Sequence, residues 1–456
     1  MLQRLRESLT LILIALLPFH ALFVTLGTRV LLGPGHAPMQ ALALWKEMLL
    51  GLILFLALVE VLHPLFDRAR ARVPSPFSID LFDGLIVALL GIAVVLFLYR
   101  PWMTTTGFVL GFKYDFIPLI AFLILRRVPW SIRFRTHVED VLLAVAGIVA
   151  LYGLLTILAP KGYFRLLGYS DAHSLYLPNG PLAAFQQISG SGIRRIQSTF
   201  SGPNQMGIWL LIPFSILATR VFHLKRLRSR SSKMMVALGI LLLVALMLTF
   251  SRSAWIGTFV IVSFAGSRAL PKKVFRDAFI GIVSLAAIAG VAASLIAPQI
   301  FLRATSTREH IARPLRAIHE MVRYPLGFGL GAAGPAANRT HEPCVYLERG
   351  ADASWAKNSP QLCVFVGPTQ VQPTEHRCDC ALLPENWYLQ LGVELGLPGM
   401  LLSLALTALV LWRLRKSEVA FLLFLSISIA ALFLHAWEDA AAAYTAWLMV
   451  AAVLSL

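Results

Sequence analysis

Two arginines and an asparagine stand before an apolar segment in a pattern that suits the binding of an anion. Arg194 and Arg195 belong to the stretch RRIQSTFSGPNQMG (194–207). Further along it, Pro203 and Asn204 are expected to begin a helix, with Asn204 as its cap. Phosphate oxygens accept hydrogen bonds from guanidinium groups and from the free N–H groups of a helix N-terminus. The stretch therefore favours a phosphate site, and anchoring of the arginines to lipid headgroups is the alternative.

A third arginine occupies a short turn between two long apolar segments. Arg252 lies in LTFSRSAWIG (248–257), a turn too short to leave the surface of a membrane. An arginine at that depth is costly unless it has an anionic partner. A lipid diphosphate would be such a partner, and a carboxylate of the same chain is the alternative.

The segments around these residues are those of a membrane protein. Of the 456 residues, 58 % are hydrophobic and 14 % are charged, and the mean hydropathy is +0.74. A soluble chain averages about 25 % charged residues, and a single water-facing core could not bury this much apolar surface. The composition excludes a soluble nucleotide-binding enzyme, a secreted disulfide scaffold and a nucleic-acid binder, despite a formal net charge of +17.

Twelve membrane-spanning helices are predicted, because a bilayer core takes roughly 20 apolar residues per helix. The first apolar run shows no secretory cleavage pattern and is expected to remain as an anchor. More than half of the 40 Lys and Arg residues lie in the amino-terminal tail and in alternate connections, which predicts cytoplasmic termini. The predicted spans are 9–32, 47–63, 79–99, 106–125, 138–158, 205–222, 234–250, 254–268, 278–297, 387–412, 418–434 and 440–456.

Two connections on the outward side are long, at about 159–204 and about 298–386. The second divides the chain into 1–297, with nine spans, and 387–456, with three. It contains all four cysteines, and an even number there fits an oxidising compartment such as a periplasm, with up to two disulfides. Bonding between the near neighbours is sterically disfavoured, so each of Cys378 and Cys380 is expected to join Cys344 or Cys363. A zinc site that uses His341 and His376 is the alternative.

The second long connection begins with a basic helix and closes with a polar pair. The helix is expected to end at Pro325 and the glycines of PLGFGLG, which either admit a sugar or phosphate close to the backbone or simply stop the helix. The connection closes at 384–400, where Glu385 and Asn386 precede an apolar helix broken at Gly396. The basic side chains of the outer helix are Arg308, His310, Arg316, His319 and Arg323.

The distribution of polar groups favours an enzyme over a transporter. A transporter needs ionisable groups near the middle of its spans and commonly shows repeated halves. The predicted spans are nearly free of charge, and the sequence has no internal repeat. The polar residues gather at the outer ends of helices, which indicates an outward-facing site that takes a lipid substrate from the bilayer.

Four stretches, in this order along the chain, resemble the O-antigen ligase and polymerase family. They are 195–204, 248–255, 324–331 and 386–399, and Lys113 with Asp115 resembles the start of that family's fourth span. Each motif alone is weak, but the four in order are specific, and the resemblance covers the chain from about residue 106 onwards. It implies an all-α, C-type glycosyltransferase-like membrane fold with a large outer loop. It also implies transfer of a glycan from undecaprenyl diphosphate to a lipid A-core sugar.

The resemblance further implies roles for individual residues. Arg195 and Arg252 would hold the diphosphate and stabilise the charge on the leaving phosphate. We expect a metal-independent, inverting displacement without a cofactor, because the diphosphate is a good leaving group and no D-x-D pair stands on the outward side. The other expected substrate-binding residues are Arg194, Arg308, Arg316, Asn386, Asn204 and Lys113.

The expected partners are the undecaprenyl-diphosphate-linked donor, the glycan acceptor and membrane lipids, in the inner membrane of a bacterium. A repeat-unit polymerase of the same family is the alternative activity. A polytopic lipid-glycan transporter is the alternative from a different class of protein.

One position departs from the family pattern, because Glu385 stands where the family has a histidine before the asparagine. A carboxylate can also accept the proton of an acceptor hydroxyl, so Glu385 is expected to be the base, with Asn386 orienting it. One alternative is that Glu385 only pairs with an outward arginine. Others place the base at a residue elsewhere in the outward segments, namely His341, His376, His435, Glu438 or Asp439.

Overall fold

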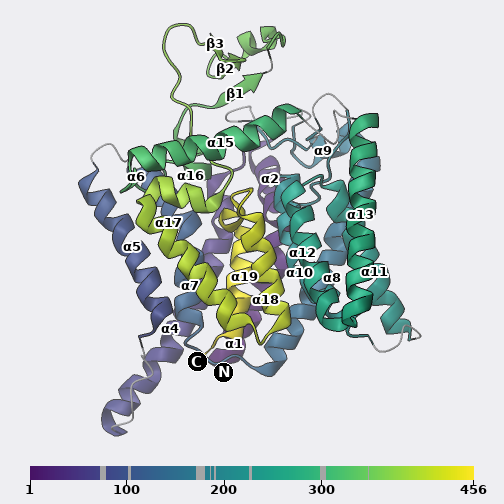
Figure 1. The fold of residues 1–456 in the computed structure, drawn as a ribbon. Coiled ribbons are helices and arrows are strands. Elements are labelled where there is room, and N and C mark those ends of the chain that lie inside the picture. Colours follow the sequence, from purple (N-terminus) through teal and green to yellow (C-terminus); the bar gives the residue numbers. More distant parts are fainter. Residues whose placement is uncertain are drawn as a thin grey trace.

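The structure of the protein is a computed structural model (Figure 1). It describes residues 1–71, 79–100, 104–170, 180–184, 186–188, 192–224, 229–297, 304–347 and 349–455, without the side chains of 63–71, 286, 289 and 304–309. The side chains of several basic residues that support the predicted orientation therefore lie outside the described part: Arg68, Arg70, Arg72, Lys225, Arg226 and Arg228.

Most of the chain is helical, and eight described helices or helix pairs are long and apolar enough to cross a membrane. A ninth is added if α6 (Thr105–Asp115) and α7 (Ile117–Leu125), which meet at 43°, form one bent span. The eight are α1 with η1 and α2 (Leu2–Leu16, Leu17–Phe19, His20–Leu32), α3 with α4 (Gln40–Ala43, Trp45–Ala71), α5 (Leu81–Tyr99), α8 (Ile132–Leu158), α10 (Pro203–Phe222), α11 (Arg230–Leu248), α13 (Lys272–Ile296) and α17 (Trp387–Leu414). The prediction of an all-α polytopic membrane protein is confirmed.

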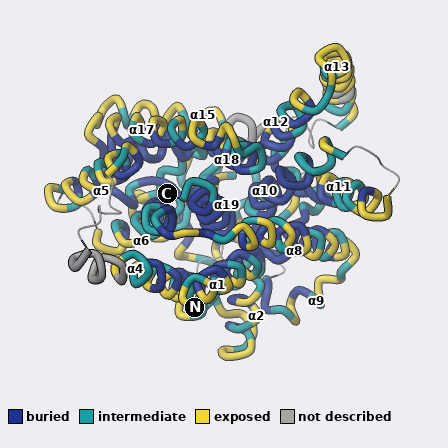
Figure 2. The backbone as a smooth tube through the Cα atoms, turned by 90° about the horizontal axis from the view of Figure 1, so that it is seen from below, coloured by how far each residue is buried: buried dark blue, intermediate teal, exposed yellow. Residues whose placement is uncertain are grey.

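Three further helices coincide with predicted spans but do not meet the same measure of length and hydropathy. They are α12 (Arg252–Ala269), α18 (Glu418–Ala430) and α19 (Ala440–Val453). All three pack within the bundle, where α12 contacts α10 and α18, and α19 contacts α7 and α10. In Figure 2, α10, α18 and α19 lie near the centre and are largely buried, whereas the described part of α13 stands exposed at the edge.

The exposed side chains of the peripheral helices are apolar, as contact with lipid requires. Phe55, Leu98 and Ile148 are examples with more than half of their surface exposed. The buried core includes Trp209, which lies in the first half of α10. Apolar side chains thus cover both the inside and the outside of the bundle.

Both termini lie at one end of the bundle, which we call the termini end (Figure 1). Several arginines at this end are held in ion pairs. Arg126 bonds Asp80 at 2.7 Å and Asp83 at 2.8 Å, and these two aspartates form the capping box that begins α5. Arg220 bonds Glu139 and Asp140, each at 2.7 Å. Some of the residues that predict orientation therefore also join neighbouring helices.

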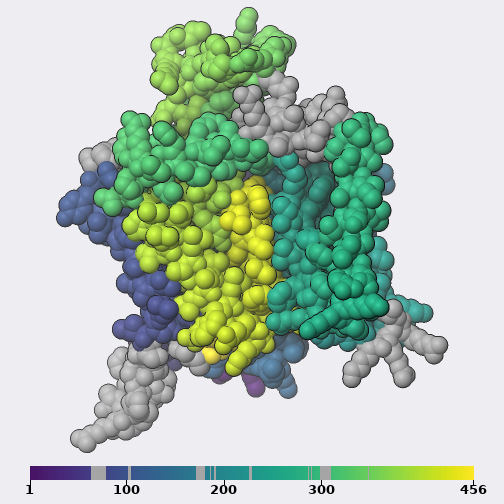
Figure 3. All heavy atoms as spheres, in the orientation of Figure 1, coloured from purple at the N-terminus to yellow at the C-terminus, as the bar shows by residue number. Residues whose placement is uncertain are grey.

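The opposite end, the loop end, carries the long connections. There α15 (Ala304–Arg323) lies across the ends of the bundle helices, and Figure 3 shows it covering part of the C-terminal helices. The predicted basic outer helix is therefore confirmed as a helix. The shorter helices of the loop end are α9 (Lys161–Leu166), α16 (Gly334–Thr340), η2 (Ser354–Asn358) and η3 (Ala436–Glu438).

A small disulfide-bonded sheet projects from the loop end, and the sequence did not predict it. Strand β1 (Cys344–Leu347) pairs in parallel with β2 (Cys363–Val366), which pairs in antiparallel fashion with β3 (Thr369–Gln372). Disulfides join Cys344 to Cys380 and Cys363 to Cys378. The prediction that each of Cys378 and Cys380 bonds to a distant cysteine is confirmed.

Candidate functional site

Hydrogen bonds join two of the predicted polar stretches at the loop end. The segment before α10 is fixed to the turn between α11 and α12, because the Ile196 N–H donates to the Leu248 carbonyl over 3.1 Å. Arg195 extends the attachment, since its Nε donates to the Thr249 carbonyl over 2.8 Å. The backbone thus anchors Arg195 only three residues from Arg252.

Arg195 also binds Asn204, although not in the way that the sequence predicts. An Nη of Arg195 donates to Oδ1 of Asn204 over 2.7 Å. Helix α10 begins at Pro203, and its cap is Gly202, which forms no side-chain hydrogen bond. The prediction that Asn204 caps α10 is therefore wrong. Asn204 lies one residue inside the helix, where its amide oxygen accepts from Arg195 instead.

Arg252 begins α12 and lies close enough to Glu385 for their charges to interact. Burial lowers the pKa of Arg252, and the negative charge of Glu385 opposes this shift. Glu385 stands next to Asn386, the cap of α17, so this interaction relates the second stretch to the fourth. A carboxylate of the chain itself therefore lies within electrostatic range of Arg252, as the alternative reading of the sequence allowed.

Two basic side chains of α15 contact Glu385. His310 Nδ1 lies against one carboxylate oxygen, and Arg313 lies against the other. Burial would raise the pKa of Glu385, but the contact with His310 and the charges of Arg313 and His435 outweigh it and lower that pKa. Pairing of Glu385 with an outer arginine, which the sequence left open, is therefore present. Arg313 contacts this carboxylate, and the charge of Arg252 lies within electrostatic range of it.

Asn386 and His435 complete this side of the site. Asn386 caps α17 by accepting from the Leu389 N–H over 3.0 Å, and its Nδ2 donates to the Leu432 carbonyl over 3.0 Å. The second bond joins the start of α17 to the turn before α19. His435 lies in that turn with both ring nitrogens buried and without a hydrogen-bond partner among the residues described. Burial, aided by the charge of Arg313, lowers the pKa of His435 to about 4.

Backbone strain marks the same stretches. Among the described non-glycine residues, those with positive φ are Ser198 (50°), Phe250 (50°) and Glu385 (52°). Each belongs to a different one of the predicted polar stretches. Such conformations cost of order 1–3 kcal/mol and cluster at functional sites, because the surrounding structure must impose them. The strain therefore supports a functional reason for the way these stretches meet.

Arg194 and Lys113, two other predicted binding residues, contact different elements of the structure. The Arg194 guanidinium stacks 4.4 Å from the ring centroid of Phe164 in α9. Lys113 pairs with Glu47 at 2.9 Å. Arg316 is exposed on α15, and the side chain of Arg308 lies outside the described part of the structure.

Lys113 belongs to a buried charged cluster that the sequence did not predict. Glu47 bonds both Lys113 and the buried Lys46, whose Nζ also lies 3.3 Å from Nε2 of His20. The signal was present in the sequence, because Lys46 and Glu47 begin a long apolar run. Neither residue was assigned a role, because the sequence alone does not show that Lys113 and His20 lie beside them.

Three carboxylates and an amide form a second buried group in the bundle. Asp115 accepts from the Trp387 Nε1–H over 2.8 Å, Gln390 donates to Glu438, and Glu394 accepts backbone N–H groups. Their charges interact with one another. Sequence reasoning did not assign Glu394 a role, although a glutamate within a predicted span is a signal in itself.

The glycine-rich turn after α15 packs against the kink of α17 rather than lying open. The Phe328 and Gly329 N–H groups donate to the Val393 and Glu394 carbonyls over 2.9 and 2.7 Å. Gly396 has φ 73°, and a Cβ there would meet the Pro325 carbonyl oxygen at 2.4 Å. Close approach of two backbones therefore explains these glycines, and the predicted break of the helix at Gly396 is confirmed.

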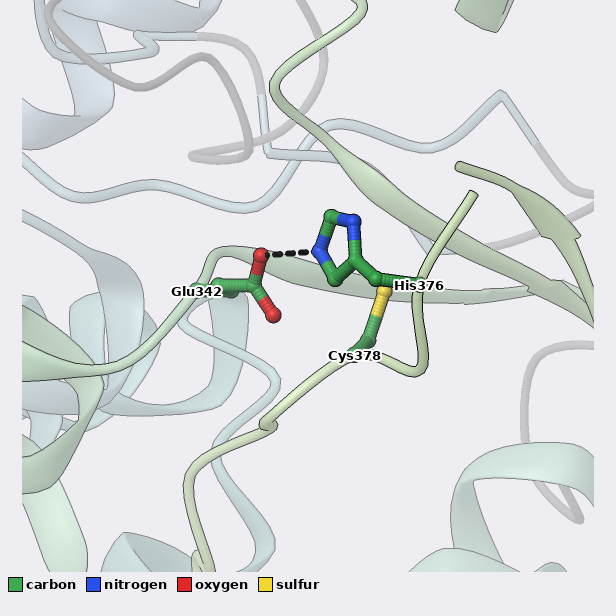
Figure 4. A group of neighbouring side chains, drawn as sticks. All are labelled: Glu342, His376 and Cys378. Carbon is green, nitrogen blue, oxygen red and sulfur yellow. Dashed lines mark hydrogen bonds and ion pairs between the residues drawn. The ribbon is translucent and has the colours of Figure 1, made fainter. Parts of the chain in front are cut away.

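The disulfide-bonded loop does not retain a thiolate for a metal. Figure 4 shows Glu342 paired with His376 at 2.8 Å, with Cys378 next to them. The Sγ of Cys378 is bonded to Cys363, and a disulfide sulfur is not the thiolate that zinc binds. His341 in turn lies 3.8 Å from Asp379. These contacts leave no cysteine thiolate for the zinc alternative, and each of the two histidines lies beside a carboxylate.

Comparison of the sequence with protein-family models, with curated proteins and with solved structures gave no match.

Proposed function

We propose that the protein is an O-antigen ligase-type glycosyltransferase of a bacterial inner membrane. It has twelve membrane helices in a C-type glycosyltransferase-like arrangement, with cytoplasmic termini and a site that faces the periplasm. Its substrates are a glycan on undecaprenyl diphosphate and a lipid A-core sugar. The reaction is a metal-independent displacement with inversion at the transferred sugar.

The observation that carries this proposal is the meeting of stretches that are distant in the sequence. Arg195 is bonded to the turn that holds Arg252, Arg252 interacts with Glu385, and α15 contacts Glu385. The glycine turn that follows α15 bonds the α17 kink. If the four motifs resembled the family only by chance, there would be no reason for their side chains to lie together at one end of the bundle.

The charge balance of the gathered residues suits an anionic lipid. Arg195, Arg252 and Arg313 contribute three positive charges, and Glu385 contributes one negative charge. A guanidinium group in a water-poor site stabilises the charge that develops on a departing phosphate. In the proposed reaction, the acceptor oxygen attacks the anomeric carbon of the transferred sugar. At the same time, the bond between that carbon and the diphosphate oxygen breaks. The electron pair stays on the undecaprenyl diphosphate.

The arrangement of the ends agrees with the proposed orientation. The termini and the paired arginines lie at one end, and both disulfides lie at the other. Disulfides persist in oxidising compartments. Labelling of cysteines introduced beside residues 195, 252 and 385 tests the orientation. An impermeant thiol reagent added outside should react with them, and reaction only from the cell interior would contradict it.

The decisive experiment reconstitutes the purified full chain with lipid-linked glycan and lipid A-core acceptor. Glycan should move to the acceptor without ATP or an ion gradient. Movement of the intact donor across the membrane without transfer would instead indicate a transporter. A deletion strain separates the ligase from a repeat-unit polymerase. Loss of a ligase leaves long polymer on the carrier lipid, whereas loss of a polymerase leaves single repeats attached to the acceptor.

A further inference from the structure

His310 and Arg313 divide the two oxygens of the Glu385 carboxylate between them. The two side chains stand three residues apart on α15, so they project from the same face of the helix. Nδ1 of His310 lies against Oε2 of Glu385, and an Nη of Arg313 lies against Oε1. Both oxygens of the carboxylate thus lie against side chains of one helix, Oε1 in a hydrogen bond with Arg313 and Oε2 in a charge contact with His310.

This engagement makes Glu385 a poor proton acceptor. A carboxylate is basic only to the extent that protonation does not break its favourable contacts, and here protonation would weaken both contacts with α15. Arg252 adds a third group that favours the ionised form. The position of Glu385 suits a group that holds and orients another residue.

The same contact gives His310 the arrangement of an oriented base. A carboxylate held at Nδ1 fixes the tautomer and direction of an imidazole and stabilises the imidazolium that forms when Nε2 takes a proton. The His310 side chain is 36 % exposed, whereas that of Glu385 is 18 % exposed. The ring is therefore more accessible to a substrate than the carboxylate that holds it.

His435 also lies within electrostatic range of Glu385 but is less suited to the reaction. Both of its ring nitrogens are buried, so an acceptor hydroxyl has no open approach to them. Its position in the turn before α19 also places it with Arg313, whose charge disfavours a second cation. The groups that act on Glu385 are thus His310 and Arg313 from α15, Arg252 from α12 and His435 from this turn.

We propose that His310 is the catalytic base of the transfer and that Glu385 is its positioning residue. The inference rests on the proposed function and changes the role that the sequence predicts for Glu385. As the acceptor oxygen bonds to the anomeric carbon, its proton passes to Nε2 of His310. The Glu385 carboxylate stabilises the resulting imidazolium, which afterwards releases the proton to water. The leaving diphosphate keeps the electron pair of the broken bond, so the step balances.

The test compares His310→Ala with His319→Ala, an exposed histidine of the same helix, in the reconstituted transfer assay. We expect His310→Ala to lower kcat by about 10²- to 10⁴-fold, the usual contribution of a general base, with little change in donor Kd. His319→Ala should remain within about twofold of the wild type. Added imidazole should restore part of the His310→Ala rate and should not affect the His319→Ala rate.

A variant of the positioning residue separates the base from a structural residue. Glu385→Gln should lower kcat with little change in donor Kd, because the imidazolium of His310 loses the negative charge that stabilises it. Added imidazole should not restore the Glu385→Gln rate, because His310 is still present. A His310→Ala rate within about threefold of the wild type, or loss of donor binding without imidazole rescue, would overturn the inference. Absence of product with the wild type would instead overturn the proposed function.

Discussion

Gly331 donates its backbone N–H to Oε1 of Glu394 over 2.8 Å, and this bond joins the glycine turn after α15 to the kink of α17. The Ala333 N–H donates to the same oxygen over 3.3 Å. Two segments more than sixty residues apart are therefore held through one carboxylate oxygen. The other oxygen, Oε2, is buried without a hydrogen-bond partner among the described residues.

The first prediction separates the acceptor role of Glu394 from its charge. Glu394→Ala leaves the N–H groups of Gly331 and Ala333 buried without their acceptor, at a cost of about 1–3 kcal/mol each. Glu394→Gln keeps an acceptor oxygen and removes a carboxylate that lies near Asp115 and Glu438. Thermal unfolding in detergent should show a lower Tm for the alanine variant and an equal or higher Tm for the glutamine variant. Equal falls in the Tm of both variants would show that the charge of Glu394 itself is needed.

The second prediction concerns the close approach at Gly331. Its φ is 80°, and a Cβ there would lie 2.2 Å from the Gly107 carbonyl oxygen in α6. Gly331→Ala should therefore shift the backbone and lower the Tm by several degrees. Gly84→Ala is the matched control, because a Cβ at that position in α5 meets nothing within 4 Å. Alanine is also the better helix former there, by about 1 kcal/mol. A fall in Tm for Gly84→Ala as large as for Gly331→Ala would refute this explanation.

The third prediction uses the bond between Arg195 and Asn204. Asn204→Asp places a negative charge against the Arg195 guanidinium, where it competes with a phosphate for the same donor. The Kd of the purified chain for undecaprenyl diphosphate should rise about tenfold or more, and the effect should shrink at high salt. Asn338→Asp adds the same charge at an exposed position of α16 and should leave this Kd unchanged. An unaltered Kd in Asn204→Asp would remove Arg195 from the phosphate site.

The sequence predicts the helices well, because hydropathy alone determines most of them. Described helices overlap each of the twelve predicted spans, and eight of these helical segments, or nine with the bent pair α6 and α7, are long and apolar enough to cross a membrane. The break at Gly396 was also predictable, since glycine and proline stand together there. The small sheet of β1 to β3 was not, because strands of four residues in a cysteine-rich loop carry too little periodic pattern.

The sequence predicts which stretches of the site matter better than what each side chain does. It singled out Arg195, Arg252 and Glu385, which the structure links. It gave the wrong role to Asn204 because the helix begins at Pro203, two residues earlier than a cap at position 204 requires. It could not reveal the contact of His310 with Glu385, because that contact depends on how α15 lies across the bundle. No local sequence pattern determines how α15 lies across the bundle.

The last prediction concerns Arg252, which begins α12 beside Glu385. If Arg252 stabilises the charge on the departing diphosphate, Arg252→Ala should lower kcat at least about a hundredfold, the scale of one lost donor to a developing oxyanion. Arg252→Lys should recover only part of the rate, because lysine keeps the charge but lacks the planar pair of donors. Arg268→Ala is the matched control, since Arg268 lies in the last turn of the same helix, at the termini end, and stacks on Phe264.

The reconstituted assay measures the transfer rate of all three variants, together with the Kd for the donor. Near-normal transfer by Arg252→Ala, or an equal loss in Arg268→Ala, would exclude Arg252 from the transition state. A loss confined to Arg252→Ala with a donor Kd close to the wild type would place its contribution in the chemical step, because a residue that only binds the ground state changes Kd first.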